Sequence, residues 1–349
     1  MKIKYLLFYA IVLLVISQTL TACRKKEKDE PAPEARSDVY AAGRDGYRAT
    51  YWKNGATVTL GKGPGSSDAN GLAISGNDVY VAGYEINNKY VAKYWRNGIA
   101  TNLSNGTNDA MANDIFIKGD DIYIAGQERV NGRWQAKYWK NGTPVALMPD
   151  RAGSIASGVA VVGNDVYLIG ERNPDINTSL ACYWKNGNRA DLSNAKTSAA
   201  YQAISVSGSD IYMIWSGAYN QFGKLQTNYS KNLGNPVKIV DGTEDVTGTA
   251  IAASGNDIYV AGWGPASGNN LLSAKYWKNG APVLLGNKQG SAFALSIALA
   301  DNDIYVAGWQ ENSQAGKAST ATYWKNGTAV NLTNGNNDAL IRKIVVVNK

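Results

Sequence analysis

Histidine is absent from the 349 residues of this chain, and cysteine occurs only at Cys23 and Cys182. Histidine is the one side chain that titrates near neutral pH without help from its surroundings. Its absence excludes Ser–His and Cys–His nucleophilic pairs, the usual zinc sites and the commonest general base. Catalysis would have to use Asp, Glu, Tyr, Lys or Arg, and the sequence carries no catalytic signature.

Other site signatures are missing as well. The chain has no Gly-x-x-x-x-Gly-Lys-Ser/Thr phosphate loop and no EF-hand-like Asp-x-Asp-x-Asp-Gly loop, so we expect no cofactor and no metal ion. One cysteine belongs to the export signal described next, so no disulfide framework is expected, and Cys182 is predicted to be a small buried hydrophobe. The net charge of +7 is spread along the chain, which argues against nucleic acid as a partner.

Residues 1–22 resemble a bacterial lipoprotein signal peptide. Two lysines precede an apolar run over residues 6–16, which is shorter than the roughly 20 residues that span a bilayer. The sequence Leu-Thr-Ala-Cys then ends at Cys23 and is similar to the lipobox, in which a small residue precedes a cysteine. The resemblance implies cleavage before Cys23, acylation of that cysteine and a lipid bilayer as a partner. A buried first helix or a plain transmembrane anchor is the alternative.

Residues 23–37 are predicted to be a disordered tether, because nearly every residue is charged until two prolines interrupt the run. Arg24 follows the cysteine, where an aspartate is associated with inner-membrane retention. The resemblance therefore implies an exported, outer-membrane lipoprotein on the periplasmic side or at the cell surface.

One unit recurs seven times in the rest of the chain. Its intervals run from 40 residues (Asp38 to Asp78) to 47 residues (Asp210 to Asp257). A first phrase similar to Asp-Val-Tyr-Val-Ala-Gly begins at Asp38, Asp78, Asp121, Asp165, Asp210, Asp257 and Asp303. A second phrase, Tyr-Trp-Lys-Asn-Gly, begins at Tyr51, Tyr94, Tyr138, Tyr183, Tyr276 and Tyr323. The fifth copy has only a decayed form of it, with Ser230 in place of tryptophan.

Each copy is predicted to form four antiparallel strands, which we call a to d. In the second copy they are residues 72–75, 78–83, 91–95 and 99–103. Gly-Asn pairs join a to b and Asn-Gly pairs join c to d, and such pairs accept the positive φ of two-residue hairpins. A four-stranded meander with this period is typical of a β-propeller blade.

The fold class is therefore all-β, a seven-bladed β-propeller. The chain starts its first copy at strand b and finishes with a lone strand a, residues 344–347, so blade one is assembled from both termini and the C-terminal strand closes the ring. An open solenoid is the alternative, but it would leave exposed sheet edges. The domains are a signal peptide (1–22), a tether (23–37) and the propeller (38–349).

The repeats resemble those of uncharacterised Bacteroidetes-type surface lipoproteins that share NDVYVAG and YWKNG units. The resemblance covers Asp38 to the C-terminus. The repeats are also similar to kelch repeats in combining a hydrophobic run, a glycine, a tyrosine and a tryptophan. Kelch repeats have a glycine pair and separate Tyr from Trp, whereas the two are adjacent here. The resemblance implies a kelch-like propeller and no particular activity.

Residues that recur in every copy are predicted to serve the fold. The tryptophan of the second phrase should pack between neighbouring sheets, and the repeat aspartate should accept hydrogen bonds from turn backbone N–H groups. Residues that vary should gather on the face formed by the b–c and d–a loops. Those at the ends of strands b and at the starts of strands a are Arg44, Tyr84, Gln127, Glu171, Trp215, Trp263, Trp309, Gln310, Glu311, Asn113, Asp114 and Arg342.

Three functions are compatible with this face. The first is a non-catalytic, ligand-binding or scaffold propeller of the cell envelope, with a glycan or protein ligand. Trp215, Trp263 and Trp309 would then bring three indoles of adjacent blades to one sector, unless they merely fill gaps between blades. The second is a carboxylate-dependent glycoside hydrolase or lyase, in which two carboxylates would lie about 5–10 Å apart. Its candidate acids are Glu85, Asp114, Glu128, Glu171 and Glu311. The third is a structural subunit of an envelope complex.

Overall fold

The computed structural model describes residues 37–148, 153–175, 177–193, 201–219, 224–240, 244–266, 271–286, 290–312 and 316–349. The predicted signal peptide, Cys23 and the tether up to Arg36 lie outside the described residues. Within the described ranges, no helix is long and apolar enough to cross a membrane.

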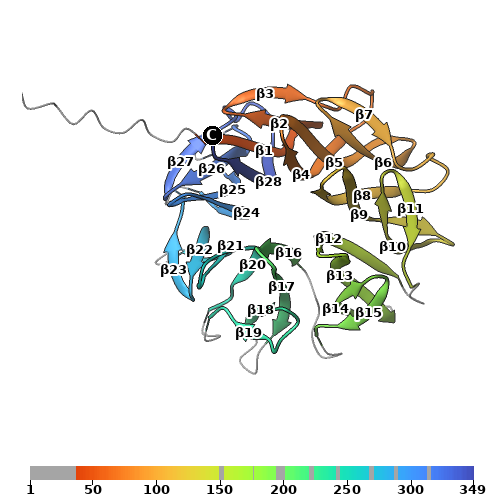
Figure 1. The fold of residues 1–349 in the computed structure, drawn as a ribbon. Helices are drawn as coiled ribbons and strands as arrows, with labels where there is room; N and C mark the ends of the chain where they lie inside the picture. The colour runs from red at the N-terminus through yellow and green to blue at the C-terminus, as the bar shows by residue number, and fades with distance from the viewer. Residues whose placement is uncertain are drawn as a thin grey trace, which may run out of the picture. The chain divides into compact units, whose positions relative to one another are not determined.

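Seven four-stranded antiparallel sheets surround a common axis in the unit from Ser37 to Asn348 (Figure 1). Blade one contains β28 (Ala339–Val347), β1 (Asp38–Asp45), β2 (Arg48–Lys53) and β3 (Ala56–Thr59). Blade two contains β4 (Ser67–Ser75), β5 (Asp78–Asn87), β6 (Lys89–Arg96) and β7 (Ile99–Asn102). Blade three contains β8 (Ala110–Lys118), β9 (Asp121–Val130), β10 (Arg133–Lys140) and β11 (Thr143–Ala146).

The remaining four blades follow in chain order. Blade four contains β12 (Ser154–Val162), β13 (Asp165–Asp175), β14 (Thr178–Lys185) and β15 (Asn188–Asp191). Blade five contains β16 (Tyr201–Ser207), β17 (Asp210–Tyr219), β18 (Leu225–Lys231) and β19 (Val237–Lys238). Blade six contains β20 (Thr247–Ser254), β21 (Asp257–Pro265), β22 (Leu272–Lys278) and β23 (Ala281–Leu284). Blade seven contains β24 (Ala292–Ala300), β25 (Asp303–Gln310), β26 (Thr320–Lys325) and β27 (Thr328–Asn331).

The C-terminal strand closes the ring, as predicted. Strand β28 pairs antiparallel with β1 from Asp38↔Val347 to Asp45↔Ala339. The backbone N–H of Gly46 also donates to the carbonyl of Asp338, at 2.9 Å. Blade one is therefore built from both ends of the described chain, and its innermost strand has its hydrogen-bonding partner.

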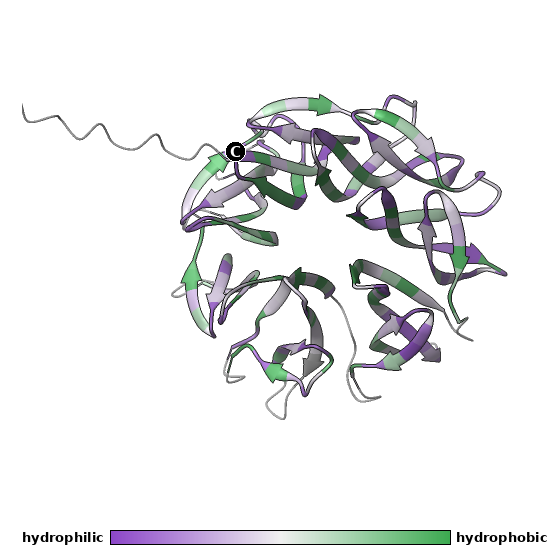
Figure 2. Ribbon diagram, viewed as in Figure 1, coloured by the Kyte–Doolittle hydropathy of each residue, from purple (hydrophilic) through white to green (hydrophobic). Residues whose placement is uncertain are grey.

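The repeat tryptophans fill the contacts between blades, which confirms their predicted role. All are at most 2% exposed: Trp52, Trp95, Trp139, Trp184, Trp277 and Trp324. Each packs against residues of the preceding blade, as Trp184 of blade four does against Tyr123 and Ala125 of blade three. Cys182 lies in that same cluster with no exposed surface, as expected for a small buried hydrophobe. Hydrophobic residues follow the inner strands of the ring in Figure 2.

The tight turns form as predicted, but the repeat aspartates use other donors than expected. In blade two, Asn97 has φ 51°, accepts from the N–H of Val79 and donates through its side-chain amide to Asp78. The same Asn–Asp pair occurs in every blade, for example Asn326–Asp303 at 2.7 Å. The donors are thus the c–d turn amide and usually a neighbouring lysine, rather than turn backbone N–H groups.

Strands a, b and c are longer than the sequence indicated. In blade two, strand a begins at Ser67, and strands b and c continue to the pair Asn87↔Lys89 around Asn88, whose φ is 61°. Part of the predicted variable loop is therefore a paired hairpin. This places Arg44, Tyr84, Gln127 and Trp309 within strands, where sheet pairing fixes their direction.

Candidate functional site

Strand a of six blades contains a β-bulge that inserts one residue next to the axis. The inserted residues are Asn70, Asn113, Ser157, Thr249, Leu295 and Arg342. With Gln202, the corresponding residue of blade five, they line an axial cavity of about 120 Å³. A larger cavity of about 410 Å³ lies against the inner strands, and Asp114 and Lys343 line both.

The bulge explains the glycine that ends the first repeat phrase. A Cβ on Gly83 would lie 2.0 Å from the carbonyl oxygen of Asp68, and one on Gly308 would lie 1.9 Å from that of Phe293. Only glycine leaves room for a backbone that approaches so closely. Blade five has Trp215 in place of this glycine, and there the strands pair without a bulge, as Gln202↔Trp215.

Two asparagines at the axis connect one blade to the next, and one of them, Asn113, is a predicted site residue. Asn70 donates to the carbonyl of Ala112 at 2.9 Å, and Asn113 donates to that of Ala156 at 2.8 Å. Each carbonyl belongs to the residue directly before the bulge of the following blade. Asn113 also donates to Gln127, so both of these predicted residues have partners within the protein.

The charged groups at the axis are paired. Arg342 of blade one donates Nε and Nη2 to the buried carboxylate of Asp68 in blade two, the latter at 2.7 Å. Lys343 lies 3.2 Å from the carboxylate of Asp114 in blade three, which also accepts from the N–H of Val159. These pairs link blade one, which closes the ring, to blades two and three.

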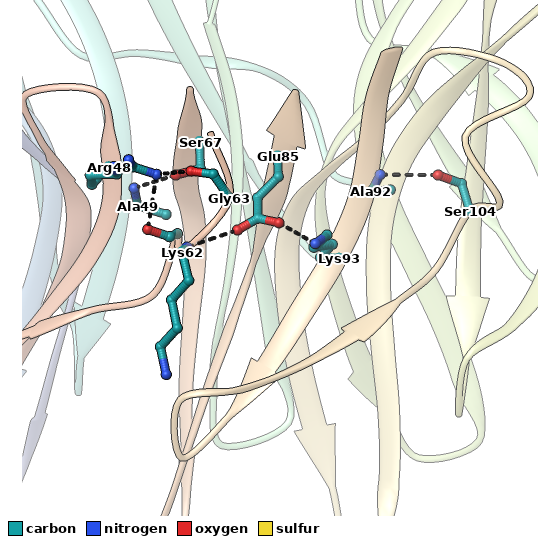
Figure 3. Close-up of polar contacts among 10 residues, drawn as sticks. Arg48, Ala49, Lys62, Gly63, Ser67, Glu85, Ala92, Lys93 and Ser104 are labelled. Atoms are coloured by element: carbon teal, nitrogen blue, oxygen red, sulfur yellow. Dashed lines mark hydrogen bonds and ion pairs between the residues drawn. The ribbon is translucent and has the colours of Figure 1, made fainter. Parts of the chain in front are cut away.

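Most candidate acids are also engaged. Glu85 accepts from the backbone N–H of Lys62 and from the ammonium of Lys93 (Figure 3), and Glu128 is paired with Lys137 in the same way. Asp114 is paired as described above. Glu311 accepts from the N–H of Ser291 at 2.9 Å.

Glu171 differs from these acids because burial raises the pKa of its carboxyl, which a hydrogen bond from Ser179 opposes. Tyr84 of blade two packs edge-on against Tyr90, and burial likewise raises the pKa of its hydroxyl. In the described part of the chain, no three carboxylate or thiol groups gather as a metal-binding cluster. Each candidate acid thus has its own partner, and only Asp114 and Glu128 share a blade.

Two of the three candidate tryptophans come together. Phe293 stacks on Trp309 with ring centres 4.3 Å apart and contacts Trp263 edge-on at 5.3 Å. Phe293 was not among the residues singled out from the sequence, although the scarcity of phenylalanine outside the repeat phrases could have drawn attention to it. The cluster joins blade six to blade seven, and both indoles are partly exposed.

Trp215 lies apart from this cluster. It is 3% exposed and packs against Ala181 and Leu192 of blade four. Blade five has Ser230 where the other blades have the repeat tryptophan, and the cluster between blades four and five contains no tryptophan. Trp215, which lies on β17 whereas Ser230 lies on β18, thus supplies a buried indole to the contact between blades four and five.

A further cavity lies between blades seven and one, and we call it the closure cavity. Its volume is about 550 Å³. The residues relevant to binding are Arg44, Trp309, Glu311, Asn312, Lys317 and Asp338. The neighbouring Gln310 is turned away, because its amide donates to Asn331 on the outermost strand. The cavity thus brings Arg44, Trp309 and Glu311 together from among the predicted residues.

Comparison with known proteins supports the fold. The sequence matches no family model and shows no significant similarity to a curated protein. A puromycin-hydrolysing peptidase from Mycobacterium tuberculosis has a similar structure, with a TM-score of 0.57 and 12% identity over 87% of this chain and 55% of that chain. An acylaminoacyl peptidase from Pyrococcus horikoshii has a TM-score of 0.52 and 13% identity over 86% of this chain and 51% of its own. This chain spans about half the length of each, and likeness at such identity shows the fold alone.

Proposed function

We propose that this chain is a non-catalytic lipoprotein of the cell envelope, anchored through acylated Cys23, whose propeller binds a glycan in the closure cavity. The observation that carries the proposal is the partly exposed indole of Trp309, stacked on Phe293 and lining a cavity of about 550 Å³. An aromatic ring held by a second ring presents a fixed apolar surface at little entropic cost.

The other groups of the closure cavity suit a polyhydroxylated ligand. Sugars present C–H faces that stack on indoles, and hydroxyl groups that both donate and accept hydrogen bonds. Glu311 and Asp338 offer acceptor oxygens, and Lys317 offers a donor. Ligand cavities commonly measure about 300–1,000 Å³, and this one lies within that range.

A protein ligand has less support. Broad apolar patches mark protein partners. The exposed large hydrophobic side chains of the described residues are instead spread over five blades: Tyr47, Ile99, Val130, Met148, Val237, Val283 and Leu284. The enzyme alternative has less support too, because three of its candidate acids are held in ion pairs with lysines: Glu85, Glu128 and Asp114.

A glycan array probed with the full-length protein tests the proposal. We expect Trp309→Ala to weaken binding about tenfold or more, since the variant removes the stacking surface. Trp134→Ala is the matched control, because Trp134 is partly exposed on blade three and lies outside the cavity. Lys317→Ala, a surface change, provides a second variant if Trp309→Ala melts at a much lower temperature. Undiminished binding by both cavity variants would refute the proposal.

A further inference from the structure

Arg44 of the closure cavity has no hydrogen-bond acceptor for its buried Nε among the described residues. Its guanidinium makes no hydrogen bond or ion pair with any described residue. Three other partly buried arginines all have acceptors: Arg48 donates to carbonyls, and Arg172 and Arg342 are paired with Asp191 and Asp68. Guanidinium groups withdrawn from water are normally matched by acceptors, so an unmatched one calls for a functional explanation.

The neighbouring carboxylates leave Arg44 unmatched because they are held elsewhere. Asp338 accepts from the N–H and hydroxyl of Ser319, at 3.1 and 3.2 Å. Glu311 accepts from the N–H of Ser291. Asp68 of blade two is paired with Arg342. Among the described residues, the cavity thus contains a guanidinium to which no carboxylate is hydrogen-bonded, although two carboxylates line the same cavity.

We infer that the closure cavity selects an acidic sugar, a hexuronate residue, whose carboxylate binds Arg44 while its ring lies on Trp309. This inference rests on the proposed glycan-binding function and adds the chemical class of the glycan. A planar carboxylate matches the guanidinium fork in a bidentate pair. A singly charged carboxylate also suits a cavity that contains Glu311 and Asp338, because these would repel a phosphate dianion more strongly.

Calorimetric titration of the full-length protein with trigalacturonate and with its methyl ester tests the inference. The two probes share rings, linkages and hydroxyl groups, and differ in that a methyl group on each carboxyl of the ester removes its negative charge. We expect the acid to bind at least tenfold more tightly than the ester, and Arg44→Gln to remove this preference with a loss of about 10- to 100-fold for the acid. Arg44→Lys should retain part of the preference, since it keeps the charge but not the fork.

Arg133→Gln is the matched control. Arg133 is exposed on the b–c hairpin of blade three, outside the cavity, so its loss reports only on unspecific attraction of an acidic sugar to a basic protein. Equal binding of acid and ester by the wild type, or an unchanged preference in Arg44→Gln, would overturn the inference. If Trp309→Ala still abolished binding in that case, the glycan proposal would stand. Displacement of trigalacturonate by equimolar inorganic phosphate would also overturn the assignment of a carboxylate ligand. The inference would likewise be overturned if the protein bound neither trigalacturonate nor its methyl ester.

Discussion

The β-bulge of strand a predicts that replacing the glycine opposite it in strand b will destabilise the fold. In Gly83→Ala, the new Cβ would lie 2.0 Å from the carbonyl oxygen of Asp68, which is backbone and has no rotamer to change. Real Cβ atoms do not approach closer than 3.0 Å, so β4 and β5 must separate locally by about 1.0 Å (3.0 − 2.0). That movement would strain the pairing at Asp68, whose carboxylate holds Arg342 of blade one.

The magnitude follows from two contributions. Overpacking of this kind costs roughly 1–3 kcal/mol, and one weakened ladder hydrogen bond adds about 1 kcal/mol. A loss of about 2–4 kcal/mol in the free energy of unfolding should lower the melting temperature by roughly 4–12 °C in a domain of this size.

Circular dichroism at increasing temperature measures this loss. Gly63→Ala is the control, because a Cβ there would meet nothing nearer than 3.8 Å and should change the melting temperature by no more than a degree or two. A Gly83→Ala protein that melts with the control would show that the bulge does not need glycine.

Three further predictions concern ring closure, a buried acid and the export signal. Deleting residues 338–349 removes β28 and should cause aggregation or loss of cooperative unfolding, whereas a deletion protein that melts like the parent would contradict closure. Because burial raises the pKa of Glu171, its carboxyl destabilises the fold as pH rises from its ordinary value of 4.5 through the folded pKa. Glu171→Gln should therefore gain more in melting temperature at pH 7 than at pH 4, and a pH-independent difference would refute this. Cys23→Ala should abolish labelling by a fatty-acid analogue, and undiminished labelling would count against lipidation.

The fold could be predicted from the sequence because its signals are local and repeated. The Asn-Gly and Gly-Asn pairs marked hairpins, and the repeat tryptophan marked the contact between blades. Both of these signals can be recognised from a residue and its immediate neighbours in the sequence. The lone C-terminal strand indicated ring closure because the first copy lacks a strand a of its own.

The β-bulge of strand a could not be predicted from local sequence signals. These signals also could not decide between the two roles considered for Trp215. The glycine of the first phrase is required by a carbonyl group in the preceding strand, so its meaning appears only when the two strands are paired. A recurring sequence of small residue, variable residue and small residue, such as Ala69-Asn70-Gly71, was the available signal. Trp215 was expected either on the variable face or filling a gap between blades, and the structure supports the second role: with Ser230 at the repeat tryptophan position, Trp215 packs into the contact with blade four.

The candidate site was predicted only in part. Sequence variation located the face and named Arg44, Trp309 and Glu311, because these residues break the repeat. It did not show that Arg342 and Asp114 are neutralised by partners, or that Arg44 is not. Pairing of this kind joins residues that are 274 and 229 positions apart, which no local pattern encodes.

A crystal structure of the full-length protein with trigalacturonate would test the central claim most directly. The account predicts a sugar ring stacked on Trp309 between blades seven and one, with its carboxylate within hydrogen-bonding distance of Arg44. A sugar bound instead in the axial cavity among Asn70, Asn113 and Gln202, with the closure cavity unoccupied, would contradict it.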